Sequence, residues 1–95
     1  MSVSAAIKVQ LPGVLRVYCG GARELPVAAD DVRAMLGEIE RRHPMLYGCI
    51  CDETGAVRRH VNVFVNTSNI RDGAGLDATL EPGDVVTILP AVSGG

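Results

Sequence analysis

The sequence predicts an α+β domain in which a mixed sheet of four to five strands packs on one main helix. Several short segments alternate apolar and polar residues, which is the pattern of half-buried strands. One segment near the middle of the chain repeats its apolar residues at helical spacing. Turns rich in Pro and Gly separate these segments. The chain has 95 residues, which is enough for one domain and too few for two.

Two strands are expected before the helix. Residues 6–11 alternate apolar and polar side chains up to a Pro-Gly pair that ends the strand. In the loop that follows, Leu15 and Val17 are expected to reach the core. The second strand covers residues 22–27, and its Pro26 suits an edge position because proline cannot donate to a ladder.

The main helix is predicted to begin at Asp30 or Asp31 and to end before Pro44. Either aspartate is a good N-cap, and both acids favour the positive end of the helix dipole. The residue before a proline is pushed out of the α region, which ends the helix. Its buried stripe follows the i, i+3, i+4, i+7 rule and consists of Val32, Met35, Leu36 and Ile39.

The second half of the chain is predicted to supply the remaining strands. Residues 45–55 are expected to be irregular, with core contacts through Leu46 and Ile50. Strands are expected at residues 61–65 and 85–89, with a brief strand at residues 70 and 71. The order is then strand, strand, helix, strand, short strand, strand. Two hairpins that flank one helix form the β-grasp, or ubiquitin-like, layout.

Composition excludes several classes of function. The net charge of −2 excludes a strongly basic nucleic-acid binder, and three aromatic residues offer almost nothing on which bases could stack. No run approaches the 18 apolar residues of a membrane span, and the N-terminus lacks the pattern of a signal peptide. An odd number of cysteines, three, fits reduced thiols in the cytoplasm. A chain this small is expected to be a binding module or carrier, not an enzyme.

Two local clusters each permit more than one interpretation. Cys49 and Cys51, with His43, offer three zinc ligands, but a structural site needs a fourth, such as Cys19 or His60. The plainer interpretation is reduced loop cysteines without a metal, and the third possibility is a redox or sulfur-relay role.

The second cluster is the basic run Arg58-Arg59-His60. It is interpreted as a solvated surface feature or as a contact for an acidic partner.

Strand alternation predicts a partner-binding patch on the helix-free face of the sheet. If the valines of residues 61–65 face the helix, Phe64 faces the other way. The same alternation turns Val86 and Ile88 inward and leaves Val85 and Leu89 outward. Phe64, Val85 and Leu89 are therefore candidate partner-binding residues.

The C-terminus is predicted to be a flexible tail on a domain formed by residues 1–89. Six residues from Pro90 reach about 20 Å when extended, which is enough for the terminal carboxylate to enter the active site of another protein. Two final glycines permit close backbone approach in a narrow channel. The tail consists of Pro90, Ala91, Val92, Ser93, Gly94 and Gly95.

Three segments carry a family resemblance. Residues 84–95, the turn Glu81-Pro82-Gly83-Asp84 and residues 61–66 resemble the MoaD/ThiS-like sulfur carriers, which are relatives of ubiquitin. Residues 88–95, together with His60-Val61-Asn62, are most similar to carriers of the CysO type. The resemblance implies that an E1-like enzyme uses ATP to adenylate the Gly95 carboxylate, which then becomes a thiocarboxylate. A further enzyme transfers that sulfur to an acceptor, and the carrier itself binds no cofactor.

The resemblance leaves the pathway open and implies one docking residue. The sulfur acceptor belongs to the synthesis of cysteine, a thiosugar, thiamin thiazole, molybdopterin or another sulfur-containing metabolite. Leu89 matches a family position that packs against the adenylating enzyme. Two alternatives use the same tail: a ubiquitin-like modifier joined to a target lysine through Gly95, and the small subunit of a molybdopterin-synthase-like complex.

Overall fold

A computed structural model describes residues 4–90 of the chain. The predicted tail residues 91–95 lie outside this range. Within it, five strands form one sheet, which confirms the predicted mixed sheet of four to five strands. The strands are β1 (Ala6–Gln10), β2 (Glu24–Ala28), β3 (Val61–Val65), β4 (Ser68–Asn69) and β5 (Val85–Pro90).

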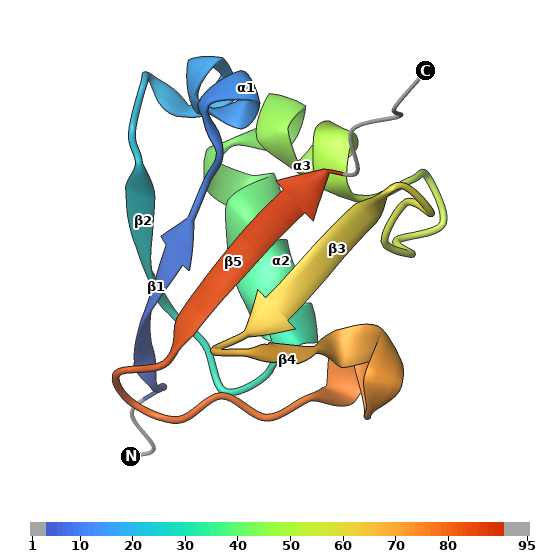
Figure 1. Cartoon of the computed structure of the whole chain (residues 1–95). Coiled ribbons are helices and arrows are strands. Elements are labelled where there is room, and N and C mark those ends of the chain that lie inside the picture. The colour runs from blue at the N-terminus through green and yellow to red at the C-terminus, as the bar shows by residue number, and fades with distance from the viewer. Residues whose placement is uncertain (1–3, 91–95) are drawn as a thin grey trace.

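The last strand lies at the centre of the sheet. The order is β2-β1-β5-β3-β4, so β5 separates the β1–β2 pair from the β3–β4 pair (Figure 1). β5 runs parallel to β1 and antiparallel to β3, and the other two pairings are antiparallel. β2 is an edge strand, as predicted from its proline.

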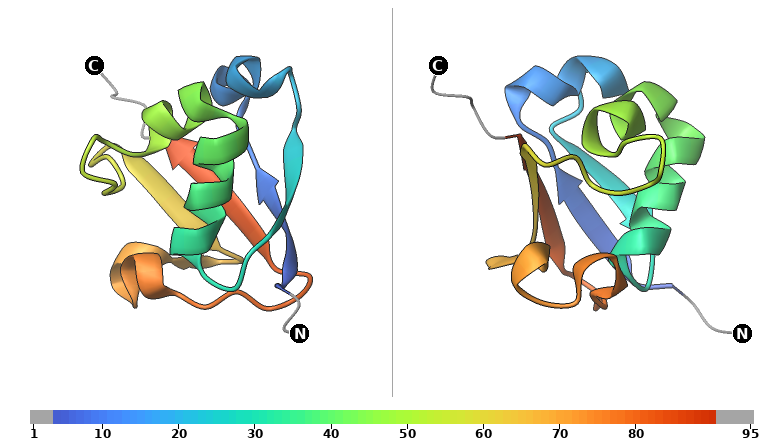
Figure 2. Two further views of the ribbon diagram at one scale, coloured as in Figure 1. Left: turned by 180° about the vertical axis from the view of Figure 1, so that it is seen from behind. Right: turned by 90° about the vertical axis from the view of Figure 1, so that its right-hand side faces the viewer.

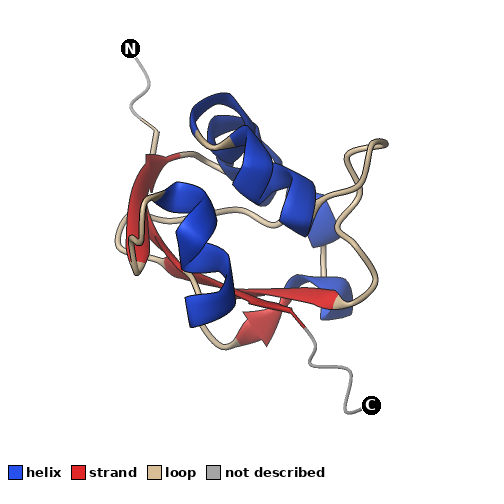
Figure 3. Cartoon of the chain, turned by 90° about the horizontal axis from the view of Figure 1, so that it is seen from above, coloured by secondary structure: helices blue, strands red, loops and turns tan. Residues whose placement is uncertain are grey.

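Helices cover one face of this sheet. The longest, α2 (Val32–Arg42), crosses behind β5 in Figure 1 and lies in front of it when the molecule is turned round (Figure 2). α1 (Gly13–Arg16) and α3 (Pro44–Ile50) lie at the end of the molecule where β5 ends. Seen from above, α2 lies on one side of the sheet (Figure 3). Three 3₁₀ turns complete the fold: η1 (Val17–Cys19), η2 (Ile70–Asp72) and η3 (Gly75–Asp77).

The core lies between α2 and the inner face of the sheet. All four residues of the predicted helical stripe are buried, and Val63, Val86 and Ile88 face them with at most 1% of their surface exposed. Asp31 is the N-cap, and its Oδ1 accepts a hydrogen bond of 2.7 Å from the Ala34 amide. The apolar stripe of α2 and the inward-facing residues of β3 and β5 therefore form one core, as predicted.

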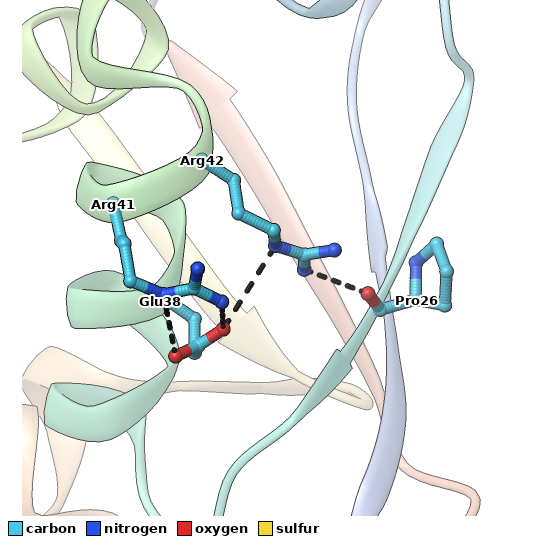
Figure 4. A network of polar contacts seen from close by, with 4 residues as sticks. All are labelled: Pro26, Glu38, Arg41 and Arg42. Atoms are coloured by element: carbon cyan, nitrogen blue, oxygen red, sulfur yellow. Dashed lines mark hydrogen bonds and ion pairs between the residues drawn. The ribbon is translucent and has the colours of Figure 1, made fainter.

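The C-terminal turn of α2 is tied to the edge strand. Arg42 Nη2 donates to the Pro26 carbonyl at 2.8 Å, and Glu38 pairs with Arg41 at 2.7 Å and with Arg42 at 3.9 Å (Figure 4). Arg41 lowers the pKa of the exposed Glu38 carboxyl through a direct hydrogen bond. The network occupies a carbonyl on a strand that has a neighbour on only one side, which makes that edge less available to other chains.

The second helix corrects one prediction. The main helix ends at Arg42, before Pro44, as predicted, but residues 45–55 are not irregular throughout, because Pro44 opens α3. Proline is favoured in the first turn of a helix because the amide it lacks would have no intrahelical partner. Leu46 and Ile50 are fully buried, as predicted.

Three smaller expectations also change. Residues 70 and 71 form a 3₁₀ turn, and the short strand is residues 68 and 69. Val17 was expected in the core, but 75% of its surface is exposed, while Leu15 is buried. β5 was predicted to stop at Leu89, yet Pro90 is its last residue and pairs with Val61.

Candidate functional site

The end of β5 sets the starting point of the predicted tail. Leu89 lies opposite Asn62, and Pro90 lies opposite Val61. The strand is therefore held by β3 up to its last described residue. Gly95 and the four residues before it lie outside the described residues, so the structure places the base of the tail and not its tip.

A polar turn fixes the beginning of β5. Gly83 adopts a positive φ of 88°, which glycine tolerates without a steric penalty. Asp84 Oδ2 accepts from the Glu81 amide at 2.9 Å, and its Oδ1 accepts from Asn66 Nδ2 at 3.1 Å. These hydrogen bonds, the Glu81 amide first, lower the pKa of the Asp84 carboxyl. The Asn66 side chain in turn accepts from the Val85 amide at 3.0 Å, which sets the register of the strand.

The structure brings the three predicted partner-binding residues to the helix-free face. Phe64 of β3 is opposite Thr87 of β5, and Leu89 is two residues after Thr87 on β5. Val85, two residues before Thr87, lies beside Lys8 of β1. Leu89 is 43% exposed, whereas Phe64 and Val85 are half-buried. Leu89 is thus the most exposed of the three as a fraction of its own surface.

Leu89 and Phe64 line two different surface grooves. The first, of about 520 Å³, lies beside the end of β5 and includes Thr87 and Leu89 with residues of the β1–α1 and β2 segments. The second, of about 460 Å³, lies at the β3–β4 edge and includes Phe64. The first groove is the one next to the base of the tail. It is lined by Gln10, Leu11, Pro12, Arg16, Arg23, Glu24, Thr87 and Leu89.

A side-chain network beside Leu89 was not predicted from the sequence. Asn62 Oδ1 accepts from Arg71 Nη1 at 2.9 Å and from Asn69 Nδ2 at 3.2 Å. Arg71 Nη2 also donates to the Arg58 carbonyl at 2.7 Å. The network joins the start of β3 to β4 and η2, which steadies the strand that holds the end of β5. No spacing in the sequence signals it, because its members meet only through the fold.

The basic run has a structural role at its first residue. Arg58 Nε donates to the Gly48 carbonyl at 2.9 Å, and the Arg58 amide donates to the Ile50 carbonyl at 2.9 Å. Arg58 therefore ties the end of α3 to the strand that follows. Arg59 and His60 are exposed.

The three cysteines are free thiols that differ in burial. Cys19 and Cys51 are buried, and Cys49 is half-buried. Burial raises the pKa of the Cys51 thiol to about 11, so this thiol keeps its proton at neutral pH. Within residues 4–90, no three His, Cys, Asp or Glu side chains gather as they would around a metal ion. The zinc interpretation of the Cys-X-Cys pair thus finds no ligand set in this part of the chain.

Comparison with known proteins identifies the family. The model of the ThiS family matches residues 9–95. The chain belongs to the ThiS family. It is 33% identical over 91 residues to the sulfur carrier protein CysO of Mycobacterium tuberculosis, a match that covers 94% of this chain and 98% of the relative. In the part of the chain described here, no helix has both the length and the apolar character that a membrane crossing requires.

Solved structures agree with the sequence relatives. One chain of the Amycolatopsis orientalis BexX/CysO complex matches with a TM-score of 0.87 and 34% identity, over 95% of this chain and 100% of that chain. The small archaeal modifier protein 1 of Methanosarcina acetivorans matches with a TM-score of 0.83 and 33% identity, over the full length of both chains. The predicted β-grasp fold and the predicted resemblance to sulfur carriers of the CysO type are confirmed.

Proposed function

We propose that this ThiS-family chain is a sulfur carrier whose Gly95 carboxylate is activated by an E1-like adenylating enzyme and converted to a thiocarboxylate. Family membership over residues 9–95 is the observation that carries the proposal. The fold supports it, because β5 ends at one extremity of the sheet, five residues before Gly95. Five extended residues span up to about 17 Å, so the carboxylate reaches an active site well beyond the domain surface.

The chemistry proceeds in two steps on the partner enzyme. The Gly95 carboxylate attacks the α-phosphate of ATP, forms an acyl-adenylate and releases pyrophosphate. Hydrosulfide then attacks the carbonyl carbon, the bond to AMP breaks, and a proton is released as the thiocarboxylate forms. The carboxylate becomes an electrophile only through adenylation, and the thiocarboxylate sulfur is a nucleophile for an activated acceptor on another enzyme.

The domain contributes positioning and contributes no acid or base. Asn66 and Asp84 fix the start of β5, and the hydrogen-bonded pairing with β3 fixes its end. The partners supply ATP, sulfur and catalytic groups, as enzymes that act on protein-bound group carriers do. The acceptor belongs to the synthesis of cysteine, a thiosugar or another sulfur-containing metabolite.

Intact mass measurement tests the proposal. The full chain is incubated with its E1-like enzyme, ATP and sulfide, and we expect its mass to rise by about 16 Da, the exchange of oxygen for sulfur. A variant that lacks Gly95 and a variant with one added residue after Gly95 serve as controls, and neither should gain this mass. Sulfur loading that survives either change would refute the role of Gly95.

A second candidate function is protein modification. The likeness to small archaeal modifier protein 1 favours it, because that protein is named as a modifier and matches over its full length. In this case the activated Gly95 forms an isopeptide bond with a lysine of a target protein and releases AMP. Adenylation is common to both functions, so the product separates them. Conjugates larger than the chain, formed without the 16 Da increase, would support modification and contradict sulfur transfer.

A further inference from the structure

Exposed large apolar side chains gather at one end of the molecule. Among residues 4–90 there are five, and they belong to α1, η1, α3 and the end of β5. These elements lie together at the end where β5 stops (Figures 1 and 2). Single exposed apolar residues are ordinary on a protein surface, but a group of them indicates a site of interaction. They are Val14, Val17, Tyr18, Met45 and Leu89.

The α1–η1 segment is apolar on two opposite sides. Leu15 and Cys19 are each 7% exposed and anchor the segment in the core. Val14, Val17 and Tyr18 are spaced i, i+3 and i+4, which places them together on the other side of one helical turn. Val14 is 70% exposed and Val17 is 75% exposed. A segment held this firmly presents its outer side chains in a fixed arrangement, which lowers the entropy cost of binding.

The groove between this segment and Leu89 carries excess positive charge. Arg16 and Arg23 line it together with a single acid, Glu24. Arg16 Nε donates to the Leu11 carbonyl at 3.0 Å, which holds its guanidinium at the groove wall. The ion pairs found in the described part of the chain involve neither Arg16 nor Arg23. Both arginines are therefore free to pair with carboxylates of another molecule.

We propose that this end of the molecule is the surface on which the adenylating enzyme docks. Its defining residues are Val14, Arg16, Val17, Tyr18 and Arg23, named here the α1 surface. The inference rests on the proposed function, because an enzyme that receives Gly95 must stand within about 17 Å of Pro90. The complementary surface on the enzyme is an apolar patch bordered by Asp and Glu side chains.

The α1 surface has the features of a binding hot spot. Tyrosine and arginine are enriched among the residues that dominate binding energy, and apolar neighbours around them exclude water. Opposite charges at the rim steer association and fix the orientation of the partners. By contrast, Phe64 and Val85 on the sheet face are half-buried.

Steady-state kinetics of adenylation tests the proposal. Pyrophosphate exchange by the E1-like enzyme is measured against the concentration of full-length chain carrying Val17→Asp or Arg23→Glu. We expect the KM for the carrier to rise at least 10-fold with an unchanged kcat, because the variants alter docking and leave Gly95 intact. The KM of the wild type should rise with salt, and that dependence should be smaller in Arg23→Glu.

Control variants carry similar changes in the first turn of α2, away from the α1 surface. Ala34→Asp introduces a carboxylate at an exposed site, and Arg33→Glu reverses an exposed arginine that, unlike Arg23, pairs with Asp77 at 3.0 Å. Both should retain the wild-type KM. Thermal unfolding of every variant checks whether the fold is kept, and Val14→Ser provides a milder second test if Val17→Asp unfolds.

The outcomes separate the two proposals. A wild-type chain that gains 16 Da, with variants that keep a normal KM, overturns the α1 surface and leaves the carrier function standing. Variants that are adenylated normally but deliver sulfur slowly would place the acceptor enzyme on this surface, which also overturns the proposal. A wild-type chain that supports neither pyrophosphate exchange nor sulfur loading overturns both.

Discussion

Replacing Leu89 with alanine tests whether the end of β5 contributes docking energy. Burying a whole leucine side chain yields about 1.5–3 kcal/mol. The domain already covers part of Leu89 and leaves 43% of its surface exposed. Burial of that remainder against a partner is therefore worth about 0.6–1.3 kcal/mol, and its loss should raise the KM for the carrier roughly 3- to 9-fold.

The assay is pyrophosphate exchange against carrier concentration, with Leu89→Met as the control because methionine keeps most of the apolar area. We expect an unchanged kcat in both variants and a near-normal KM for Leu89→Met. Urea unfolding accompanies the kinetics, so that a loss of fold is not mistaken for a loss of docking. A Leu89→Ala chain that is folded and has a wild-type KM would refute the claim that Leu89 is buried in the complex.

Three further predictions concern stability. Leu46→Ala should lower the free energy of unfolding in urea by about 2–5 kcal/mol because Leu46 is fully buried, and a loss below 1 kcal/mol would mean that α3 is not part of the core. Asp31→Ala should cost about 1 kcal/mol through loss of the N-cap, while Asp31→Asn should cost less, and equal losses would contradict a capping role. The Cys51 thiol has a raised pKa of about 11 in the folded chain, so it deprotonates more readily when unfolded. Its contribution to stability is complete below about pH 8.5 and falls as the pH rises toward 11. Cys51→Ala should show a shallower decline in stability between pH 8.5 and 11, and parallel curves would contradict this.

The regular elements were predictable because each carries its own period. Val61 and Val63 on β3 and Val86 and Ile88 on β5 alternate with outward residues, and all four are buried. The stripe on α2 repeats at helical spacing and meets them. Each helix or strand in a layered fold buries one face against the neighbouring layer, and this burial produces the apolar period in its sequence.

The remaining features depend on contacts that spacing does not encode. α3 has only two fully buried residues, Leu46 and Ile50, which is too few to show a helical period. A proline such as Pro44 can end one helix or begin the next, so it does not by itself predict α3. Val17 is apolar, yet the 3₁₀ turn directs it to solvent while Cys19 is buried. The groove beside Leu89 is formed by segments that are more than 60 residues apart in the sequence, so no local pattern could predict it.

The central position of β5 has a consequence for how the chain is made. Synthesis proceeds from the N-terminus, so β5 is the last strand to leave the ribosome. Until it arrives, β1–β2 and β3–β4 are separate hairpins without a common neighbour, and an isolated hairpin is marginally stable in water. The sheet therefore closes only after residues 85–90 are available. Synthesis interrupted before β5 leaves the two strand pairs without the strand that joins them, so the sheet cannot be completed.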